Sequence, residues 1–138
     1  MCGICGELRF NNTEITNVRI QEMLESIASR GPDNTGQYKD DNVFLGHKRL
    51  SVIDISSKSN QPMEDKNLII VFNGVIFNYK ELRSFLIKEG YKFNSDGDTE
   101  VILKCYEHYG EKLVNHLDGV FSFSIYDKQK NELFCARD

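Results

Sequence analysis

The sequence predicts an α+β fold with mainly antiparallel sheets, and three observations lead to that class. Short apolar or alternating segments typical of strands occur near both ends and in the middle of the chain, at residues 3–10, 68–72 and 121–125. Between them, apolar residues recur with helical spacing. Strands and helices do not alternate strictly, as they do in a doubly wound parallel sheet, so antiparallel pairing is favoured.

The N-terminal part is expected to form a strand followed by a helix. Residues 3–10 are short and punctuated by glycine, as in a buried strand. A helix is predicted from about residue 17 to residue 28, because four apolar residues fall on one helical face: Ile20, Met23, Leu24 and Ile27. The segment Arg30-Gly31-Pro32-Asp33 ends this helix, since the residue before proline avoids the α region.

The middle of the chain is expected to supply further strands. Residues 36–38 and 43–52 have strand character and are separated by a polar turn. Residues 54–67 are predicted to be a polar loop. The apolar run 68–72 is typical of a strand covered on both faces, and it is expected to end at Asn73-Gly74.

The C-terminal half is expected to contain two helices and a hairpin. One helix is predicted over residues 78–89, and another begins with Asp98 as its N-cap. One side of the first helix carries Tyr79, Leu82, Phe85 and Leu86. The predicted buried residues of the second are Ile102, Cys105, Tyr106 and Tyr109. Alternating residues 121–126 and the segment 132–135 then form the hairpin.

Composition excludes several classes of function. The chain has 138 residues with 17 Lys+Arg against 21 Asp+Glu, a net charge of −4 and a pI near 5.4, so it offers no electrostatic footprint for nucleic acid. Its longest apolar run, Leu68–Phe72, is far shorter than the roughly 20 residues of a membrane span. No basic and apolar targeting segment occurs at the N-terminus. These features predict a cytoplasmic protein with reduced cysteines.

Cys2 is the first candidate for chemistry. Removal of Met1 would leave Cys2 with a thiol and a free α-amino group on one carbon, and an amine with a pKa of about 7.7–8.0 can act as a built-in base. An accidental cysteine is the alternative. The spacing Cys2-x-x-Cys5 also fits a zinc or redox site, but closely spaced partner ligands are lacking, and no metal site is predicted.

Three further positions have both a chemical and an ordinary interpretation. Asn73-Gly74 offers two adjacent N–H donors, the composition of an oxyanion hole, although Asn-Gly is more commonly a turn. Arg49 could hold a carboxylate as a bidentate partner, or be a surface charge. Asp98 could cap a helix and also meet a ligand's ammonium group.

Several motifs in a fixed order indicate a family. They are Met1-Cys2-Gly3-Ile4, Arg30-Gly31-Pro32-Asp33, His47-Lys48-Arg49-Leu50-Ser51, Gln61-Pro62-Met63, Phe72-Asn73-Gly74, Asp98-Thr99-Glu100-Val101, Leu117-Asp118-Gly119-Val120-Phe121 and Ala136-Arg137-Asp138. In this order they resemble the N-terminal glutaminase domain of asparagine synthetase, a class II glutamine amidotransferase of the N-terminal-nucleophile hydrolases. The resemblance spans the chain.

The resemblance implies a four-layer αββα sandwich that hydrolyses L-glutamine to glutamate and ammonia. It assigns the nucleophile to Cys2 and the oxyanion hole to Asn73 and Gly74. The substrate-binding residues that it implies are Arg49 for the α-carboxylate, Asp98 for the α-ammonium, Leu50, Ser51, Val52 and Ile53 along the backbone, and position 75. His47 belongs to the motif without a chemical role, and a packed core histidine is expected there.

Two departures from the family pattern matter. The family usually has glutamate where this chain has Val75, so one carboxylate for the substrate ammonium is missing and weaker glutamine binding is expected. The sequence also stops at Asp138, where family members continue, so residues 1–138 are expected to form a partial glutaminase domain without the ATP-binding synthetase domain. ATP and Mg²⁺ are therefore expected only with that missing domain.

The expected partners follow from this interpretation. They are L-glutamine and the synthetase domain of a longer chain. A second copy in a homodimer is a further expected partner, because missing strands would leave a sheet edge uncovered. Nucleic acid and membrane are not expected. The alternatives are a non-catalytic module for assembly, with Val75 marking decay of the site, and an amidotransferase that uses an acceptor other than aspartate.

Overall fold

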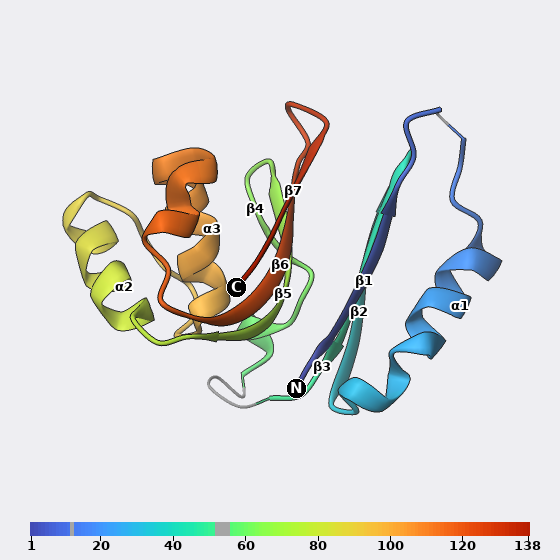
Figure 1. The fold of residues 1–138 in the computed structure, drawn as a ribbon, viewed down its shortest axis with the longest axis horizontal. Coiled ribbons are helices and arrows are strands. Elements are labelled where there is room, and N and C mark those ends of the chain that lie inside the picture. Colours follow the sequence, from blue (N-terminus) through green and yellow to red (C-terminus); the bar gives the residue numbers. More distant parts are fainter. Residues whose placement is uncertain (12, 52–55) are drawn as a thin grey trace.

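The chain folds into four layers, with two sheets face to face and helices on the two outer faces (Figure 1). The structure is a computed structural model that describes residues 1–11, 13–51 and 56–138. One sheet is three-stranded with the order β1-β3-β2, and the other is four-stranded with the order β4-β5-β6-β7. All recorded strand pairs are antiparallel. The predicted αββα sandwich and its antiparallel sheets are confirmed.

The strands have these bounds: β1 Gly3–Leu8, β2 Asn34–Asp40, β3 Val43–Arg49, β4 Met63–Asp65, β5 Leu68–Ile76, β6 Gly119–Asp127 and β7 Glu132–Arg137. The α-helices are α1 Asn17–Ser26, α2 Tyr79–Lys88 and α3 Asp98–Tyr109, and short 3₁₀ helices are η1 Ala28–Arg30, η2 Ser57–Ser59 and η3 Gly110–Asn115. Helix α1 lies outside the β1-β3-β2 sheet, whereas α2 and α3 lie outside the other sheet (Figure 1).

Alternation along the strands separates the core into layers. On β3 and β5, Val43, Leu45, Ile69 and Val71 pack together between the sheets with other apolar residues. The residues in between point the opposite way, and Phe44 packs against α1. Because side chains alternate between the two faces of a strand, later positions of the same parity extend toward the lower end of the gap between the sheets. His47, Arg49 and Asn73 occupy these positions.

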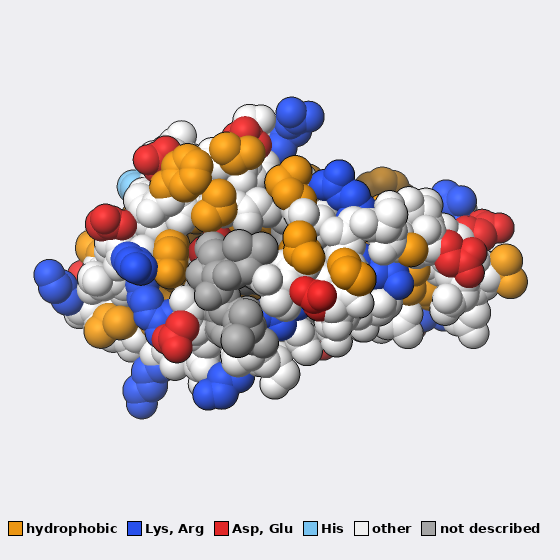
Figure 2. Space-filling view, turned by 90° about the horizontal axis from the view of Figure 1, so that it is seen from below, with side chains coloured by type: hydrophobic (Ala, Val, Ile, Leu, Met, Phe, Trp, Pro, Cys, Tyr) orange, Lys and Arg blue, Asp and Glu red, His pale blue; other side chains and the backbone are white. Residues whose placement is uncertain are grey.

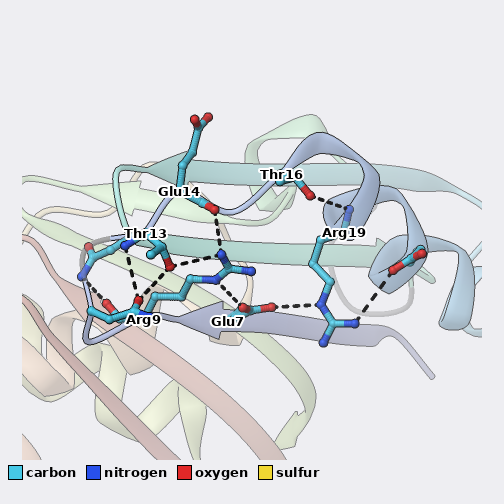
Figure 3. Close-up of polar contacts among 9 residues, drawn as sticks. Glu7, Arg9, Thr13, Glu14, Thr16 and Arg19 are labelled. Carbon is cyan, nitrogen blue, oxygen red and sulfur yellow. Dashed lines mark hydrogen bonds and ion pairs between the residues drawn. The ribbon is translucent and has the colours of Figure 1, made fainter.

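A polar network fastens α1 to the first sheet (Figure 3). The Glu7 carboxylate accepts hydrogen bonds from Arg9 Nε at 2.6 Å and from Arg19 Nε at 3.1 Å, and both guanidinium groups hold its pKa below the usual value. Arg9 Nη1 also donates to the Glu14 carbonyl at 2.7 Å, and Thr16 Oγ1 caps α1 by accepting from the Arg19 N–H. Arg9 and Glu14 are thereby linked to each other, and Glu7 of β1 is linked to Arg19 of α1.

Most predicted elements are present, with three corrections in the strands. Strand β3 ends at Arg49 rather than at residue 52. Strand β5 does not end at Asn73-Gly74 but continues to Ile76, because Asn73 and Gly74 remain paired with β6. The predicted polar loop 54–67 contains the short strand β4, which is paired with the start of β5 and could not be recognised from three residues.

One correction concerns the helices. The N-cap of α3 is Gly97, so Asp98 is the first helical residue. Its carboxylate accepts a hydrogen bond from the Ile76 N–H of β5 as well as from backbone N–H groups at the start of α3. Phe85 is 38% exposed, whereas Leu82 and Leu86 on the same predicted face are buried. In the part of the chain that the structure describes, no helix is long and apolar enough to cross a membrane.

Candidate active site

A cavity of about 330 Å³ lies at the lower end of the sandwich, where the N-terminus meets both sheets. Figure 2 looks onto this end of the molecule, where several hydrophobic side chains lie at the surface. The cavity is lined by Met1, Cys2, Arg49, Leu50, Ser51, Ser59, Gln61, Phe72, Asn73, Gly74, Val75, Gly97, Asp98, Thr99 and Val120. The candidate residues named from the sequence thus converge here from strands and helices far apart in the chain.

The Cys2 thiol is held at the cavity by the segment after β3. Its Sγ accepts a hydrogen bond from the Leu50 N–H at 3.3 Å and lies 3.5 Å from the Leu50 carbonyl oxygen. Arg30 Nε donates to the Cys2 carbonyl at 3.2 Å, and the Asp33 carboxylate accepts from the Ser51 N–H at 2.7 Å. The Arg-Gly-Pro-Asp segment therefore braces both chain segments around the thiol.

Cys5 does not share a site with Cys2. The Cys5 side chain packs against the cluster of Ile15, Ile20, Leu24 and Phe44 beneath α1, whereas Cys2 lines the cavity between the sheets. Burial raises the pKa of the Cys5 thiol. Among the described residues, no group of three or more His, Cys, Asp or Glu side chains is placed to hold a metal ion. The zinc or redox interpretation of the Cys-x-x-Cys spacing has no geometric support.

Arg49 places a buried positive charge on the cavity wall. The side chain is 6% exposed, and its Nη1 donates to the Ser56 carbonyl at 2.8 Å and to Asn60 Oδ1 at 2.5 Å. These bonds fix the guanidinium on the inter-sheet side of β3. Arg49 is therefore a buried cation with a fixed orientation rather than a surface charge.

Asp98 supplies the opposite charge at the other side of the cavity. Its carboxylate is 5% exposed and accepts a hydrogen bond from the Ile76 N–H at 3.0 Å. Burial raises its pKa, and hydrogen bonds from the backbone of Ile76, Asp98 and Thr99 oppose the shift. A buried carboxylate of this kind gains from a bound cation, because an opposite charge compensates its lost hydration.

Asn73 and Gly74 line the same cavity from β5. Asn73 Oδ1 is buried and has no hydrogen-bond partner among the described residues. Gly74 has φ +148°, and a Cβ at this position would stand 2.2 Å from the Val120 carbonyl oxygen of β6. Only glycine fits this close approach of the two strands. An unpaired buried amide costs about 1–3 kcal/mol, which a polar ligand can recover.

The remaining predicted residues divide into two groups. Leu50, Ser51 and Val75 line the cavity, as expected, while Val52 and Ile53 lie outside the described residues. Val75 pairs with Val120 across β5 and β6, so both strands present apolar side chains at this wall.

Sequence reasoning assigned no role to Gln61 or Thr99. Both are buried and line the cavity. The Gln61-Pro62-Met63 motif was the only signal for Gln61, since nothing local in the sequence shows which distant groups its side chain reaches.

His47 is buried behind the cavity, as expected of a core histidine. The residue is 0% exposed, and neither ring nitrogen has a hydrogen-bond partner among the described residues. Burial, together with the charge of Arg49, lowers its pKa to about 4, and the nearby Phe72 backbone opposes the shift. The imidazole is therefore neutral at pH 7.

This histidine is expected to make the domain sensitive to acid. Between pH 6.5 and about 4 the unfolded chain takes up a proton at His47 and the folded chain does not. The free energy of unfolding should therefore fall with the pH, by about 2 kcal/mol from this residue between pH 7.0 and 4.5. Urea unfolding at pH 7.0 and 4.5 measures the loss, and His47→Gln should remove it. Asp98 has the opposite effect on the free energy of unfolding, but it is present in both the wild type and His47→Gln. Equal pH dependence of the wild type and His47→Gln would contradict the prediction.

The whole chain, residues 1–138, matches the family described as "Glutamine amidotransferase domain". The chain therefore belongs to this family, in agreement with the resemblance inferred from the motifs.

Within this family, the chain is similar to curated asparagine synthetases. The chain is 43% identical over 145 residues to asparagine synthetase [glutamine-hydrolyzing] 1 of Bacillus subtilis, covering 100% of this chain and 22% of the relative. It is 40% identical over 141 residues to asparagine synthetase [glutamine-hydrolyzing] 1 of Arabidopsis thaliana, covering 100% of this chain and 24% of the relative. The chain thus spans about a quarter of the length of these curated relatives.

Solved structures support the fold. The glutamine phosphoribosylpyrophosphate amidotransferase of B. subtilis superposes with a TM-score of 0.63 at 19% identity, over 99% of this chain and 30% of that chain. An allosteric regulatory enzyme of purine biosynthesis gives a TM-score of 0.61 at 22% identity, over 72% of this chain and 24% of that one. At these identities the likeness concerns the fold alone.

Proposed function

We propose that this chain hydrolyses L-glutamine to glutamate and ammonia, with Cys2 as the nucleophile. The observation that carries the proposal is the convergence, in one cavity, of a thiol, a buried cation and a buried carboxylate around the Asn73-Gly74 pair. Arg49 and Asp98 match the α-carboxylate and α-ammonium groups of an amino acid. The unpaired Asn73 amide is complementary to a second amide, the side chain of glutamine.

Activation of the thiol requires removal of Met1. Met1 is 68% exposed and precedes a small residue, so it is accessible for processing. The α-amino group of Cys2 then takes the thiol proton, and the thiolate attacks the side-chain carbonyl carbon of glutamine. The new C–S bond forms as the carbonyl π electrons move to oxygen.

The oxyanion of this tetrahedral intermediate needs two donors. The Asn73 side-chain amide and the Gly74 N–H supply them from β5, and each such donor contributes about 2.7–4 kcal/mol of transition-state stabilisation. The Cys2 ammonium protonates the amide nitrogen of the intermediate, and collapse of the intermediate breaks the C–N bond and releases that nitrogen as ammonia. Water, deprotonated by the same amine, then hydrolyses the γ-glutamyl thioester to glutamate and restores the thiol.

The longer relatives suggest what consumes the ammonia. Their names describe glutamine-hydrolysing asparagine synthetases, so we propose that the ammonia amidates an activated carboxylate, aspartate by default, in a synthetase domain of the full-length chain. ATP and Mg²⁺ belong to that domain in this proposal. A cytoplasmic location and a homodimer remain predictions from the sequence.

Covalent labelling tests the nucleophile directly. The chain is incubated with a diazo-ketone that mimics glutamine, and its intact mass is measured before and after. The first spectrum shows whether Met1 has been removed. One adduct that maps to Cys2 and is prevented by glutamine supports the proposal. A chain that lacks Met1 and forms no adduct would contradict it and favour a non-catalytic module for assembly.

Val75→Glu is expected to improve glutamine binding. Val75 lines the cavity that Asp98 also lines, so a glutamate there would add a second carboxylate for the substrate ammonium. A charge-assisted hydrogen bond contributes about 1.5–3 kcal/mol, so the KM for glutamine should fall about tenfold or more. The kcat should change little. Steady-state ammonia release measures both constants, with Val75→Gln as the uncharged control. An unchanged KM in Val75→Glu would show that a carboxylate at position 75 does not contact the substrate ammonium.

A further inference from the structure

The oxyanion segment of β5 is fastened at both of its ends to groups outside its sheet. On the C-terminal side, the Ile76 N–H donates to the Asp98 carboxylate at 3.0 Å. On the N-terminal side, the Phe72 N–H donates to Gln61 Oε1 at 2.6 Å. Asn73, Gly74 and Val75 lie between these two attachments. The position of the oxyanion donors therefore depends on both.

The Gln61 side chain supplies the hydrogen-bond acceptor that β4 does not provide for the Phe72 N–H. Strand β4 begins at Met63, opposite Ile70, and does not extend far enough to pair with Phe72. A buried N–H without a partner is costly, and the Gln61 side chain supplies the acceptor. Gln61 is 7% exposed, so water cannot easily replace this hydrogen bond.

The other end of the Gln61 amide reaches the substrate-ammonium side of the cavity. Gln61 Nε2 donates to Thr99 Oγ1 at 3.2 Å, and Thr99 directly follows Asp98 at the start of α3. One buried side chain thus connects the residue before the oxyanion pair with the residue after the ammonium-binding carboxylate.

Both sides of this connection are held in place. The Gln61 backbone is packed against β2 so closely that a Cβ on Gly36 would lie 1.9 Å from the Gln61 carbonyl oxygen. At the start of α3, the buried Glu100 carboxylate accepts from the Ser95 N–H and Oγ, both at 2.7 Å. The Gln61 amide consequently links two braced elements rather than two flexible ones.

We propose that Gln61 is a positioning residue that sets the separation between the oxyanion donors on β5 and the Asp98 carboxylate, and thereby selects the length of the amino-acid amide. The inference rests on the proposed function. Glutamine spans from the ammonium site to the oxyanion site, whereas asparagine is one methylene shorter and can fill only one of the two. A fixed separation therefore favours glutamine.

Loss of the link should reduce this discrimination. One methylene is worth about 10–200-fold in a well-defined pocket, and a misplacement of about 1 Å can cost about 100-fold in rate. Glutamine, which uses both ends, loses rate when the ends move independently. Asparagine, which reaches only one end, loses little. The ratio between the two substrates should fall about tenfold or more, through the kcat for glutamine.

The test compares Gln61→Met, which keeps the length of the side chain but removes both polar groups, with Thr99→Val, which breaks only the link to α3. Inactivation rate constants are measured by intact mass with two diazo-ketones, one of glutamine length and one of asparagine length. The kcat and KM for glutamine are measured in parallel. Both variants should lower the ratio of the two rate constants about tenfold or more, and Thr99→Ser, which retains Oγ1, should restore it.

Controls separate positioning from general instability. Gln37→Met makes the same replacement on the exposed face of β2, and Leu113→Ala destabilises the core away from the cavity; both should retain the wild-type ratio. If Gln61→Met does not fold, Thr99→Val decides the question alone. If Gln61→Met and Thr99→Val both keep the wild-type kcat and the wild-type ratio of the two inactivation rate constants, the inference is wrong and the proposed function is unaffected. A wild-type chain that neither hydrolyses glutamine nor is labelled at Cys2 would overturn both.

Discussion

Cys2→Ser is expected to lower glutamine hydrolysis by about 10⁴-fold or more, because loss of the nucleophile leaves only binding and the oxyanion donors to act on the substrate. Serine is nearly the same size, and its hydroxyl can accept the hydrogen bond that the Leu50 N–H now donates to Sγ at 3.3 Å. The free energy of unfolding should therefore change by less than about 1 kcal/mol. The measurement is ammonia release at saturating glutamine on a chain shown by mass to lack Met1.

Cys5→Ser is the matched control for this variant. Cys5 lies on the other face of β1, within the cluster beneath α1. It carries the same chemical group three residues away, so its replacement should leave kcat within about threefold of the wild type, as for a substitution away from the site. Substantial activity in Cys2→Ser, or a large loss of activity in Cys5→Ser, would show that Cys2 is not the nucleophile and would contradict the mechanism.

The fold class could be predicted from local patterns because this chain's strands and helices have clear periodicities. Alternation over Phe121, Phe123 and Ile125 predicted a strand, and these three side chains are buried in the structure. Strand β4 escaped prediction, since Met63–Asp65 has no periodicity of its own and is a strand only because β5 pairs with it. A strand of only three residues is too short to show an alternation of its own, even though its partner β5 follows directly in the sequence.

The site was less predictable from residue patterns than from the order of motifs. Asn-Gly is by itself a turn signal, and the structure shows it within β5 instead, because β6 pairs with both residues. Asp98 had the composition of an N-cap, yet Gly97 takes that position and the carboxylate turns to the Ile76 N–H. In both cases a tertiary contact overrides the local preference, and both residues line the cavity.

Gln61 marks the point at which sequence reasoning ends. A buried glutamine beside a proline is compatible with many roles, and its hydrogen-bond partners are 11 and 38 residues away. Only the packing of β4, β5 and α3 brings these partners together. The residues that define the chemistry were thus recognisable from the motifs, whereas the residues that hold them at the required separation appear only in three dimensions.

Gly74→Ala is the second substitution for which we expect a large effect, on both stability and activity. A Cβ at Gly74 would stand 2.2 Å from the Val120 carbonyl oxygen, and both groups are backbone atoms of paired strands that cannot move independently. The unfavourable φ of +148° adds to this contact. We expect a loss of about 3 kcal/mol or more in the free energy of unfolding, since a strained φ alone costs about 1–3 kcal/mol.

Gly90→Ala separates the two causes. Gly90 also has a positive φ, +95°, but a Cβ there would meet nothing within 4 Å. This variant should therefore lose only the backbone contribution, about 1–3 kcal/mol, and keep its glutaminase activity. In the folded fraction of Gly74→Ala, displacement of the Gly74 N–H should lower kcat about 10²–10³-fold, as loss of one oxyanion donor does. Urea unfolding and steady-state kinetics measure both effects. Equal destabilisation of the two variants would assign the cost to φ alone and remove the close contact of β5 and β6 as the reason for glycine at the oxyanion position.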